Sequence, residues 1–222
     1  MGRLYIENRI IMKDIYIFGA SGYAKETVLL IKEMGEYIIK AFVDKNNLNQ
    51  KFASVNNFTY PIISEDDFYQ ICKKERQEAV ISIANWEVVH KLVMRFDNYC
   101  NFPNIIHPSS AFKGKYNIGR GNIISYDCLF TEDITIGSFN RFNVRVAIGH
   151  NSTIGDYNHF NSSVNIAGNV VIGNNNLFGI NSIVIQNLII SDGNTIGTAS
   201  LILKNITKTG TYFGVPAKRL NL

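Results

Sequence analysis

The amino-acid sequence predicts an α/β N-terminal Rossmann-like domain followed by a left-handed parallel β-helix of hexapeptide repeats. Three observations lead to this prediction. From residue 106 to residue 202, every sixth residue is Ile, Val or Phe without exception. In the same region asparagine recurs at intervals of 18 residues. Before residue 102, short apolar segments alternate with amphipathic ones, as strands and helices do in an α/β domain.

The six-residue repeat fits a strand that turns a corner every six residues. A helix of period 3.6 and a flat strand of period 2 do not fit it. Three such sides make one coil of 18 residues, so residues 18 apart stack on one another. Stepping by 18 gives an inward column of isoleucines and one of phenylalanines, namely Ile118, Ile136, Ile154, Ile172 and Ile190, and Phe142, Phe160 and Phe178. The repeat region therefore holds between five and six coils.

We interpret the asparagine column as a set of corners of the β-helix. Its members are Asn122, Asn140, Asn158, Asn176 and Asn194. Asparagine tolerates a positive φ better than other non-glycine residues. We therefore expect each coil to turn through a left-handed conformation at these positions.

Residues 13–101 have the order of elements of a Rossmann-like domain. The pattern predicts a strand over 15–18, a tight turn over 19–22, a helix over 23–34 that ends at Gly35, and a strand over 38–43 that ends at Asp44. Amides at the start of such a helix can hold phosphate oxygens. Ala24 stands where a third glycine would complete the fingerprint. The turn alone therefore leaves nucleotide binding and a purely conformational role equally open.

The remaining elements complete the domain and lead into the repeat. Residues 45–60 are polar and asparagine-rich, which predicts a loop or an irregular strand. Ser64 is the expected N-cap of a helix that ends near residue 74, a strand follows over 79–83, and Asn85 precedes a helix over 86–96. Asn85 thus lies at a strand's carboxyl end, where open α/β sheets bind ligands. The β-helix spans residues 102–207, and residues 208–222 form a tail that caps its last coil.

Composition excludes several classes of protein. The net charge of +4 is dispersed along 222 residues, which argues against nucleic acid as a partner and suits polyanionic ligands such as nucleotides or coenzyme A. No apolar run approaches the roughly 18 residues of a membrane span. The extension over residues 1–12 lacks the order of a signal peptide, and Met12 is a candidate native start. The odd number of scattered cysteines indicates reduced thiols, at Cys72, Cys100 and Cys128. We expect a cytoplasmic protein without membrane insertion.

Together these features resemble the nucleotide-sugar acetyltransferases of the bacillosamine and perosamine N-acetyltransferase type, with the sialic-acid O-acetyltransferases as close relatives. The resemblance runs from residue 15 to residue 220. It depends on four motifs: Ile17-Phe18-Gly19-Ala20-Ser21-Gly22, Gly149-His150 through Ile154-Gly155-Asp156, Ala167-Gly168-Asn169-Val170, and Gly214-Val215-Pro216-Ala217-Lys218. It implies a homotrimer that binds acetyl-CoA between neighbouring β-helices, a nucleotide-linked amino sugar held by the N-terminal domain, and no metal.

The resemblance also implies catalytic roles. His150 matches the proposed base of the family, and the Gly168 amide matches the group that stabilises the oxyanion. The bacillosamine enzymes have a glutamate after this histidine, whereas this chain has Asn151, which supplies no negative charge. The 18-residue register offers Glu132, one coil below His150, as a substitute, because adjacent strands lie about 4.8 Å apart. A solvated surface acid is the alternative for Glu132. Gly168, one coil above, leaves room for a thioester beside the histidine.

Further residues are assigned to the two ligands by the resemblance. It places acetyl-CoA from the neighbouring subunit against His159, Gly168, Ile180 and Thr198. It places the nucleotide sugar at Gly19, Ser21, Gly22, Tyr23, Asp44, Lys45, Ala84 and Asn85. The bacillosamine enzymes have histidine where this chain has Tyr23. We interpret His90 and His107 as structural residues.

The predicted function is transfer of an acetyl group from acetyl-CoA to the amine of a nucleotide-linked amino sugar, a 4-amino-4,6-dideoxy sugar, for surface glycan or lipopolysaccharide synthesis. One alternative is O-acetylation of a sugar hydroxyl. A hydroxyl depends more heavily on a base than a free amine does, so the absent glutamate favours the amine. A zinc enzyme of the β-helical carbonic anhydrase type would need converging histidines. A scaffold that binds nucleotides without reaction is the last alternative.

Overall fold

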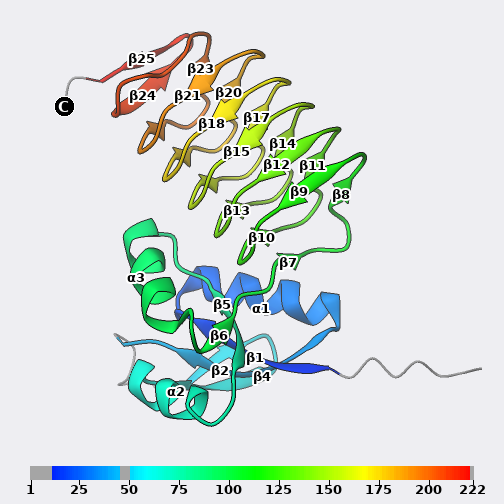
Figure 1. Cartoon of the computed structure of the whole chain (residues 1–222), viewed down its shortest axis with the longest axis vertical. Coiled ribbons are helices and arrows are strands. Elements are labelled where there is room, and N and C mark those ends of the chain that lie inside the picture. Colours follow the sequence, from blue (N-terminus) through cyan, green and yellow to red (C-terminus); the bar gives the residue numbers. More distant parts are fainter. Residues whose placement is uncertain (1–11, 46–50, 221–222) are drawn as a thin grey trace, which may run out of the picture.

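The computed structural model describes residues 12–45 and 51–220. Apart from Met12, the expected extension over residues 1–12 lies outside the described residues, as do the last two residues of the tail. The chain forms an α/β domain and a prism of stacked coils, which ends in a C-terminal hairpin (Figure 1). This is the predicted order of the two parts.

A sheet in the order β3-β4-β2-β1-β5-β6 forms the centre of the N-terminal domain. Its strands are β1 (Lys13–Phe18), β2 (Tyr37–Val43), β3 (Phe52–Val55), β4 (Phe58–Ile63), β5 (Gln77–Ile81) and β6 (Cys100–Asn101). The helices are α1 (Gly22–Met34), α2 (Glu65–Cys72) and α3 (Trp86–Phe96). Strand β1 pairs in parallel with both β2 and β5, which confirms the Rossmann-like centre.

The helix boundaries follow the signals in the sequence. Gly35 ends α1 in a left-handed conformation with a φ of 70°. The Ser64 hydroxyl accepts a hydrogen bond from the Asp67 amide at the start of α2. The Asn85 side-chain oxygen accepts one from the Val88 amide at the start of α3. These contacts satisfy amides that have no partner within the helix.

The loop or irregular strand expected over residues 45–60 requires correction from residue 51 onward, while residues 46–50 lie outside the described residues. Strands β3 and β4 form an antiparallel hairpin that turns at Asn56, whose φ is 52°. In β3 the buried Ala53 and Val55 alternate with exposed residues, which is the pattern of a half-buried strand. This alternation is short and adjoins several asparagines, so the overall polarity of the segment concealed the strand pattern in the sequence.

The prism has three sheets, which we name sides 1, 2 and 3. Side 1 contains β7 (Ile105–Ile106), β10 (Ile123–Ile124), β13 (Arg141–Phe142), β16 (His159–Phe160), β19 (Leu177–Phe178) and β22 (Thr195–Ile196). Side 2 contains β8 (Ala111–Phe112), β11 (Leu129–Phe130), β14 (Ala147–Ile148), β17 (Asn165–Ile166), β20 (Ile183–Val184) and β23 (Leu201–Ile202). Side 3 contains β9 (Tyr116–Ile118), β12 (Ile134–Ile136), β15 (Thr153–Ile154), β18 (Val171–Ile172) and β21 (Ile189–Ile190).

The core of the prism consists of the residues of the six-residue repeat. Every member from Ile124 to Ile202 is buried. The rings of Phe142, Phe160 and Phe178 stack at centroid separations of 4.8 and 4.7 Å. Each fully buried side chain of this size contributes about 2 kcal/mol to folding. The strands pair in parallel with a register of 18 residues, as Ile124 opposite Phe142 shows. The left-handed β-helix of between five and six coils is confirmed.

The asparagine column has a different role from the one predicted. The left-handed corners lie one residue earlier, at Phe139, Tyr157 and Asn175, with φ of 57°, 58° and 59°. The asparagines themselves are buried. Asn158 donates to the Asn140 side-chain oxygen from its main-chain nitrogen at 2.8 Å and from its side-chain nitrogen at 3.1 Å. The same pair of bonds recurs at each step of the column. The column is therefore an internal hydrogen-bonded ladder, which satisfies buried polar groups.

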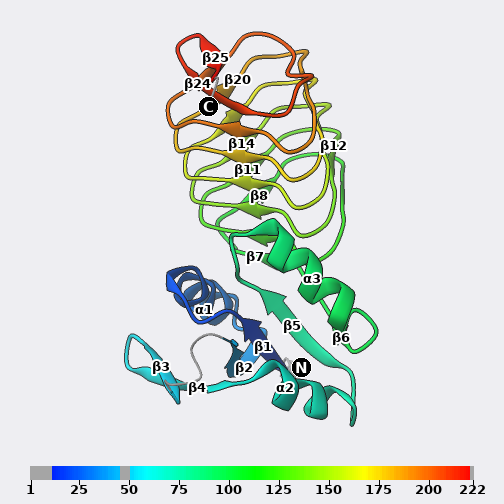
Figure 2. The same ribbon diagram turned by 90° about the vertical axis from the view of Figure 1, so that its left-hand side faces the viewer.

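Side 1 packs against the N-terminal domain (Figures 1 and 2). Ile105 and Ile123 of the first coils belong to a hydrophobic cluster of that domain. Phe139 and Tyr157, from higher coils, pack against a second cluster that contains residues of α3. The lower coils of side 1 are thus covered by the chain's own N-terminal domain.

Several polar contacts also join the domains. The Nε2 atom of His107 lies 2.8 Å from a Glu33 carboxylate oxygen on α1. Arg120 forms an ion pair with Asp97 at the end of α3. His107 is buried and its Nδ1 atom lies 2.8 Å from the Ser109 hydroxyl, which agrees with the structural role predicted for this histidine.

The C-terminal tail closes the opposite end of the prism. Strand β24 (Thr211–Gly214) pairs in parallel with β22, and β25 (Ala217–Arg219) pairs with β24 in an antiparallel hairpin. Tyr212 and Ala217 pack against the core of the prism. The inward residues of the last coil, Ile202 and Ile206, are therefore buried, whereas Leu203 is exposed.

Candidate active site

His150 lies at the corner between sides 2 and 3, after β14 and before β15. The corner residue is Asn151, whose φ is 59°. The His150 side chain is exposed, and its Nδ1 atom lies 3.1 Å from the Asn151 side-chain oxygen. An amide oxygen can only accept, so Nδ1 carries the proton in this contact and Nε2 carries the lone pair. Asn151 thus presents Nε2 as a proton acceptor without supplying charge.

Gly168 lies directly above His150, as the 18-residue register predicts. A Cβ at position 168 would lie 2.5 Å from Nε2 and 2.6 Å from Cε1 of His150. Any side chain there would displace the imidazole. The expected room for a thioester is therefore filled by the imidazole ring itself, which covers the buried Gly168.

The main-chain amide of Gly168 has no hydrogen-bond acceptor, unlike the amides on either side of it in the chain, and the same holds for the stacked amides of His150 and Gln186 among the described residues. The Ala167 amide donates to the Val184 carbonyl, and the Asn169 amide donates to the His150 carbonyl at 2.7 Å. Within residues 12–45 and 51–220, the Gly168 amide donates to no protein acceptor. A donor without a partner beside a proton acceptor is the arrangement that stabilisation of a developing oxyanion requires.

Glu132 points away from His150, contrary to the prediction that it supports the imidazole. The two residues stack, since the Asn151 amide donates to the Glu132 carbonyl. The Glu132 carboxylate, however, leans one coil down, toward Gly114 and the Lys115 amide at 3.4 Å. Gly114 has no side chain, so this direction is open. We therefore assign no catalytic role to Glu132.

The residues predicted to contact acetyl-CoA lie in three separate places, one of which is the corner of sides 2 and 3 that holds Gly168. Ile180 and Thr198 are exposed and stack at the corner between sides 1 and 2. His159 lies on side 1 in β16, only 8% exposed, with its Nε2 atom 3.5 Å from the Tyr23 hydroxyl of the same chain. The expected exposure of His159 to a ligand of the neighbouring subunit is thus corrected, because the N-terminal domain buries the imidazole.

Burial and the nearby Arg141 cation lower the pKa of His159 to about 4. Burial is the larger cause, because a charged imidazole loses its hydration there. His159 is therefore neutral at neutral pH, and its ring can accept a hydrogen bond from the Tyr23 hydroxyl.

This lowered pKa predicts a pH dependence of stability. In the unfolded chain the pKa of a histidine is about 6.5, so below that pH the unfolded state binds a proton that the folded state refuses. The stability contributed by neutral His159 should be complete above pH 6.5 and fall by about 3 kcal/mol as the pH drops to 4. Urea denaturation at several pH values measures this as a shrinking difference in unfolding free energy between wild type and His159→Gln. A difference that stays constant over this range would contradict the prediction.

The predicted nucleotide site is a cavity of about 430 Å³ in the N-terminal domain. Six of the eight predicted residues line it: Gly19, Ser21, Tyr23, Asp44, Lys45 and Ala84. Gly22 begins α1 and Asn85 caps α3, so both lie beside the lining residues. Sequence reasoning missed the apolar wall and one acid, namely Ile83, Val88, Leu92 and Glu65. The helical spacing of Val88 and Leu92 marks a buried face, and this pattern does not distinguish core from cavity.

The turn after β1 has the geometry that its glycine requires. Gly19 has a φ of 94°, and a Cβ there would lie 3.0 Å from both the Ser82 carbonyl oxygen and Ile83. The Ala20 amide donates to the Asp44 carboxylate at 2.8 Å, which joins the turn to the end of β2. The cavity thus lies at the carboxyl ends of the parallel strands, where open α/β sheets bind ligands.

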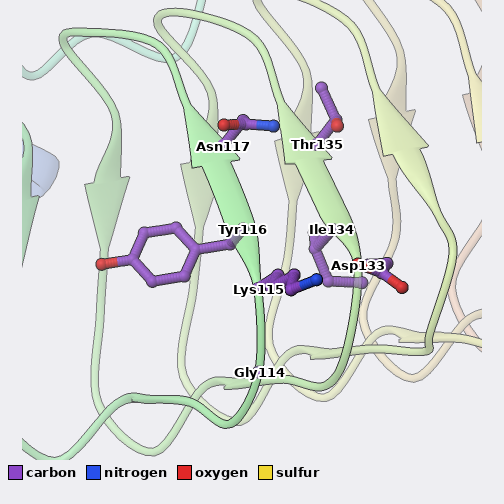
Figure 3. Close-up of a pocket in the computed structure, with 7 residues that line it drawn as sticks. All are labelled: Gly114, Lys115, Tyr116, Asn117, Asp133, Ile134 and Thr135. Atoms are coloured by element: carbon purple, nitrogen blue, oxygen red, sulfur yellow. The ribbon is translucent and has the colours of Figure 1, made fainter.

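A second hollow of about 470 Å³ lies on side 3 and is lined by Gly114, Lys115, Tyr116, Asn117, Asp133, Ile134 and Thr135 (Figure 3). The Tyr116 ring projects from β9 at its edge. The hollow is broad and open, and the residues predicted for the active site lie elsewhere. Size alone therefore does not identify the reaction site.

Two further findings concern metals and membranes. Among the described residues, no three His, Cys, Asp or Glu side chains are placed to hold a metal ion together. None of the helices in the same part of the chain combines the length and apolar character that crossing a membrane demands.

Comparison with known proteins agrees with this architecture. The family model of the PglD N-terminal domain matches residues 14–96. PerB from Caulobacter crescentus, solved with CoA and GDP-perosamine, has a TM-score of 0.86 at 20% identity, covering 94% of this chain and 97% of PerB. WeeI from Acinetobacter baumannii AYE has a TM-score of 0.80 at 24% identity, over 93% of this chain and 99% of WeeI.

A third solved structure is similar over the same length. The acetyltransferase domain of PglB from Neisseria gonorrhoeae FA1090, in complex with acetyl coenzyme A, has a TM-score of 0.81 at 20% identity, over 94% of this chain and all of that domain. A search of curated proteins found no match. At these identities the structures establish the fold of the whole chain.

Proposed function

We propose that this chain, which joins a PglD N-terminal domain to a β-helix with the fold of perosamine N-acetyltransferase, transfers an acetyl group from acetyl-CoA to the amine of a nucleotide-linked amino sugar. The observation that supports this most directly is the pairing of His150 Nε2 with Gly168. It combines a proton acceptor with an unpartnered amide at one exposed corner.

The reaction uses these two groups in sequence. The amine arrives unprotonated and its lone pair attacks the thioester carbonyl carbon, forming the C–N bond. The Gly168 amide donates a hydrogen bond to the oxygen, which becomes negatively charged. His150 Nε2 takes a proton from the nitrogen, the C–S bond breaks, and the thiolate of CoA receives the proton from the imidazolium.

Two facts favour an amino sugar as the acceptor. PerB, which has the same fold, was solved with CoA and GDP-perosamine, a nucleotide-linked amino sugar. The neutral Asn151 partner of His150 suits an amine, which needs less help from a base than a hydroxyl does. We further propose that the reaction serves the synthesis of a surface glycan such as lipopolysaccharide and takes place in the cytoplasm.

A homotrimer fits the arrangement of the two sites. The nucleotide cavity belongs to the domain that covers side 1, whereas His150 lies across the prism at the corner of sides 2 and 3. A nucleotide sugar bound to one chain therefore faces away from His150 of that chain. A neighbouring copy supplies the missing half, and the corner of Ile180 and Thr198 is available for acetyl-CoA at such an interface.

The decisive experiment is an acetyl-transfer assay with acetyl-CoA and two acceptor panels. One panel contains UDP-, dTDP- and GDP-linked 4-amino-4,6-dideoxy sugars, and the other contains sialic acids as hydroxyl acceptors. We expect CoA release with an amino sugar only. Release with the hydroxyl acceptors alone would replace the proposal by O-acetylation, and no release with either panel would refute acetyl transfer to these sugars.

Asn151→Asp should change the pH dependence of the reaction. Aspartate tolerates the left-handed corner and places a negative charge beside His150 Nδ1, which favours the protonated imidazole. We expect the acidic limb of the kcat profile to move to higher pH by about one unit. Asn151→Gly, which keeps the backbone conformation and removes the contact, is the matched control and should lower kcat without this shift. An unchanged profile in Asn151→Asp would show that Asn151 does not act on the imidazole.

A further inference from the structure

Arg141 is a buried cation between the two domains, and the sequence analysis missed it. It lies on side 1 in β13, one coil below His159, and is 8% exposed. Charged side chains are rarely buried to this extent unless other groups compensate for the lost hydration. Burial lowers the pKa of Arg141 from its usual value, and the nearby Glu26 and Tyr23 oppose this effect.

The guanidinium of Arg141 contacts two elements that carry residues lining the nucleotide cavity. Its Nη2 atom donates to the Glu26 carboxylate on α1 at 3.2 Å, and its Nη1 atom donates to the Ser82 hydroxyl, just after β5, at 3.3 Å. Helix α1 and the segment after β5 are the two elements that carry Tyr23, Ile83 and Ala84 into the cavity. Arg141, a side chain of the β-helix, thus joins α1 and the segment after β5 from outside the cavity.

The Tyr23 side chain is held by several contacts at once. The Arg141 guanidinium carbon lies 4.1 Å from the centroid of the Tyr23 ring, in cation–π geometry. The Tyr23 hydroxyl lies 3.5 Å from His159 Nε2, and its carbonyl accepts a hydrogen bond from the Thr27 hydroxyl at 3.0 Å. The Thr27 hydroxyl in turn lies 2.7 Å from that of Ser82, so the ring is fixed at its face, edge and main chain.

We propose that Arg141 is a positioning residue for the nucleotide sugar: it sets the orientation of Tyr23 in the cavity, so the β-helix determines how tightly the N-terminal domain binds its ligand. This inference depends on the proposed function for the identity of the ligand. It predicts that the two domains are coupled in binding, although Arg141 itself lies outside the cavity. Tyr23 is the residue that would touch the ligand.

Arg141→Met tests the inference, because methionine fills a similar volume without charge or planar stacking. We expect the Kd of the tightest-binding nucleoside diphosphate, chosen from UDP, dTDP and GDP by calorimetry, to rise at least about tenfold. The Kd of acetyl-CoA should stay within about twofold, because Gly168, Ile180 and Thr198 lie at other corners and His159 is buried by the N-terminal domain. In the acetyl-transfer assay the same variant should raise KM for the amino sugar and leave kcat within about threefold.

Arg120→Met is the matched control, since Arg120 also joins the domains but pairs with Asp97 at the end of α3. It should leave both dissociation constants unchanged. If Arg120→Met weakens nucleotide binding as much as Arg141→Met does, domain docking in general is responsible and the inference is wrong. Arg141→Lys, which keeps the charge but not the planar fork, covers the case in which Arg141→Met does not fold, and it should weaken binding severalfold. Normal affinity in Arg141→Lys would then overturn the inference.

A double-mutant cycle tests whether Arg141 acts through Tyr23. If it does, Arg141→Met should weaken binding little further in a Tyr23→Ala background. Additive losses would overturn the inference. Calorimetry with the nucleoside diphosphates does not depend on turnover, so it measures the coupling between Arg141 and Tyr23 even if the wild type transfers no acetyl group. The absence of acetyl transfer would refute the proposed function alone.

Discussion

Replacing His150 with alanine is expected to lower kcat at least about 100-fold, because general-base help is typically worth 10²- to 10⁴-fold. The imidazole is exposed at its corner and contacts only the Asn151 side chain and the surface of Gly168 among the groups described above. Its loss should therefore not disturb the fold. Steady-state kinetics with the preferred amino sugar give kcat, and calorimetry gives the affinity for acetyl-CoA, which should be unchanged.

His90→Ala is the matched control for this variant. His90 is an exposed histidine of α3 whose ring lies near Tyr157, away from the His150 corner. Its kcat should equal that of the wild type. Near-normal turnover in His150→Ala would show that the imidazole is not the proton acceptor, and a parallel loss of acetyl-CoA affinity would assign it to binding instead.

Gly168→Ala should be nearly as damaging, with kcat reduced about 100-fold. The added methyl group would lie 2.5 Å from His150 Nε2, closer than atoms in van der Waals contact, so the imidazole must move away from Gly168. The proton acceptor and the oxyanion donor are then separated, and a displacement of this size is enough to lower kcat by about two orders of magnitude. Thermal denaturation and kinetics of the variant measure the two consequences separately, and we expect the melting temperature to change little.

Gly114→Ala provides the control, because position 114 belongs to the same stacked column as position 168. Its methyl group would displace only the flexible Glu132 carboxylate and approach the Glu132 Cα to 3.1 Å. We expect normal activity. A loss of activity in Gly114→Ala would restore a role for Glu132, and normal activity in Gly168→Ala would refute the close contact on which the proposed mechanism depends.

The repeat was predictable because burial inside the prism is imposed locally, once in every six residues. The same arithmetic placed Gly168 over His150 correctly, since parallel coils have a fixed register of 18 residues. The register determines which residues are stacked, but it does not determine the direction in which a side chain points. Glu132 and His150 occupy equivalent positions and lean in opposite directions, each toward a neighbouring glycine.

Contacts between the domains were not predictable from these patterns. His159 and Arg141 precede the repeat residues on side 1, a position that is exposed or half-buried on the other sides of the prism. Their burial depends on how α1 and α3 pack against the coils, and that packing involves residues more than 50 positions apart. The predicted role of the asparagine column was wrong for a related reason. Asparagine suits both a left-handed corner and an internal hydrogen-bonded position, and the sequence alone does not distinguish the two.

The amide ladder inside the prism has a consequence for how such chains can change in length. Each asparagine from Asn122 to Asn176 meets an identical partner above and below, so removing or duplicating 18 consecutive residues within the column rejoins it without a mismatch. A cut after Gly168 would bring Asn187 to the place of Asn169, and both have a left-handed backbone. The prism can therefore gain or lose whole coils during evolution while the reaction corner stays intact. An insertion whose length is not a multiple of 18 residues would break the asparagine column.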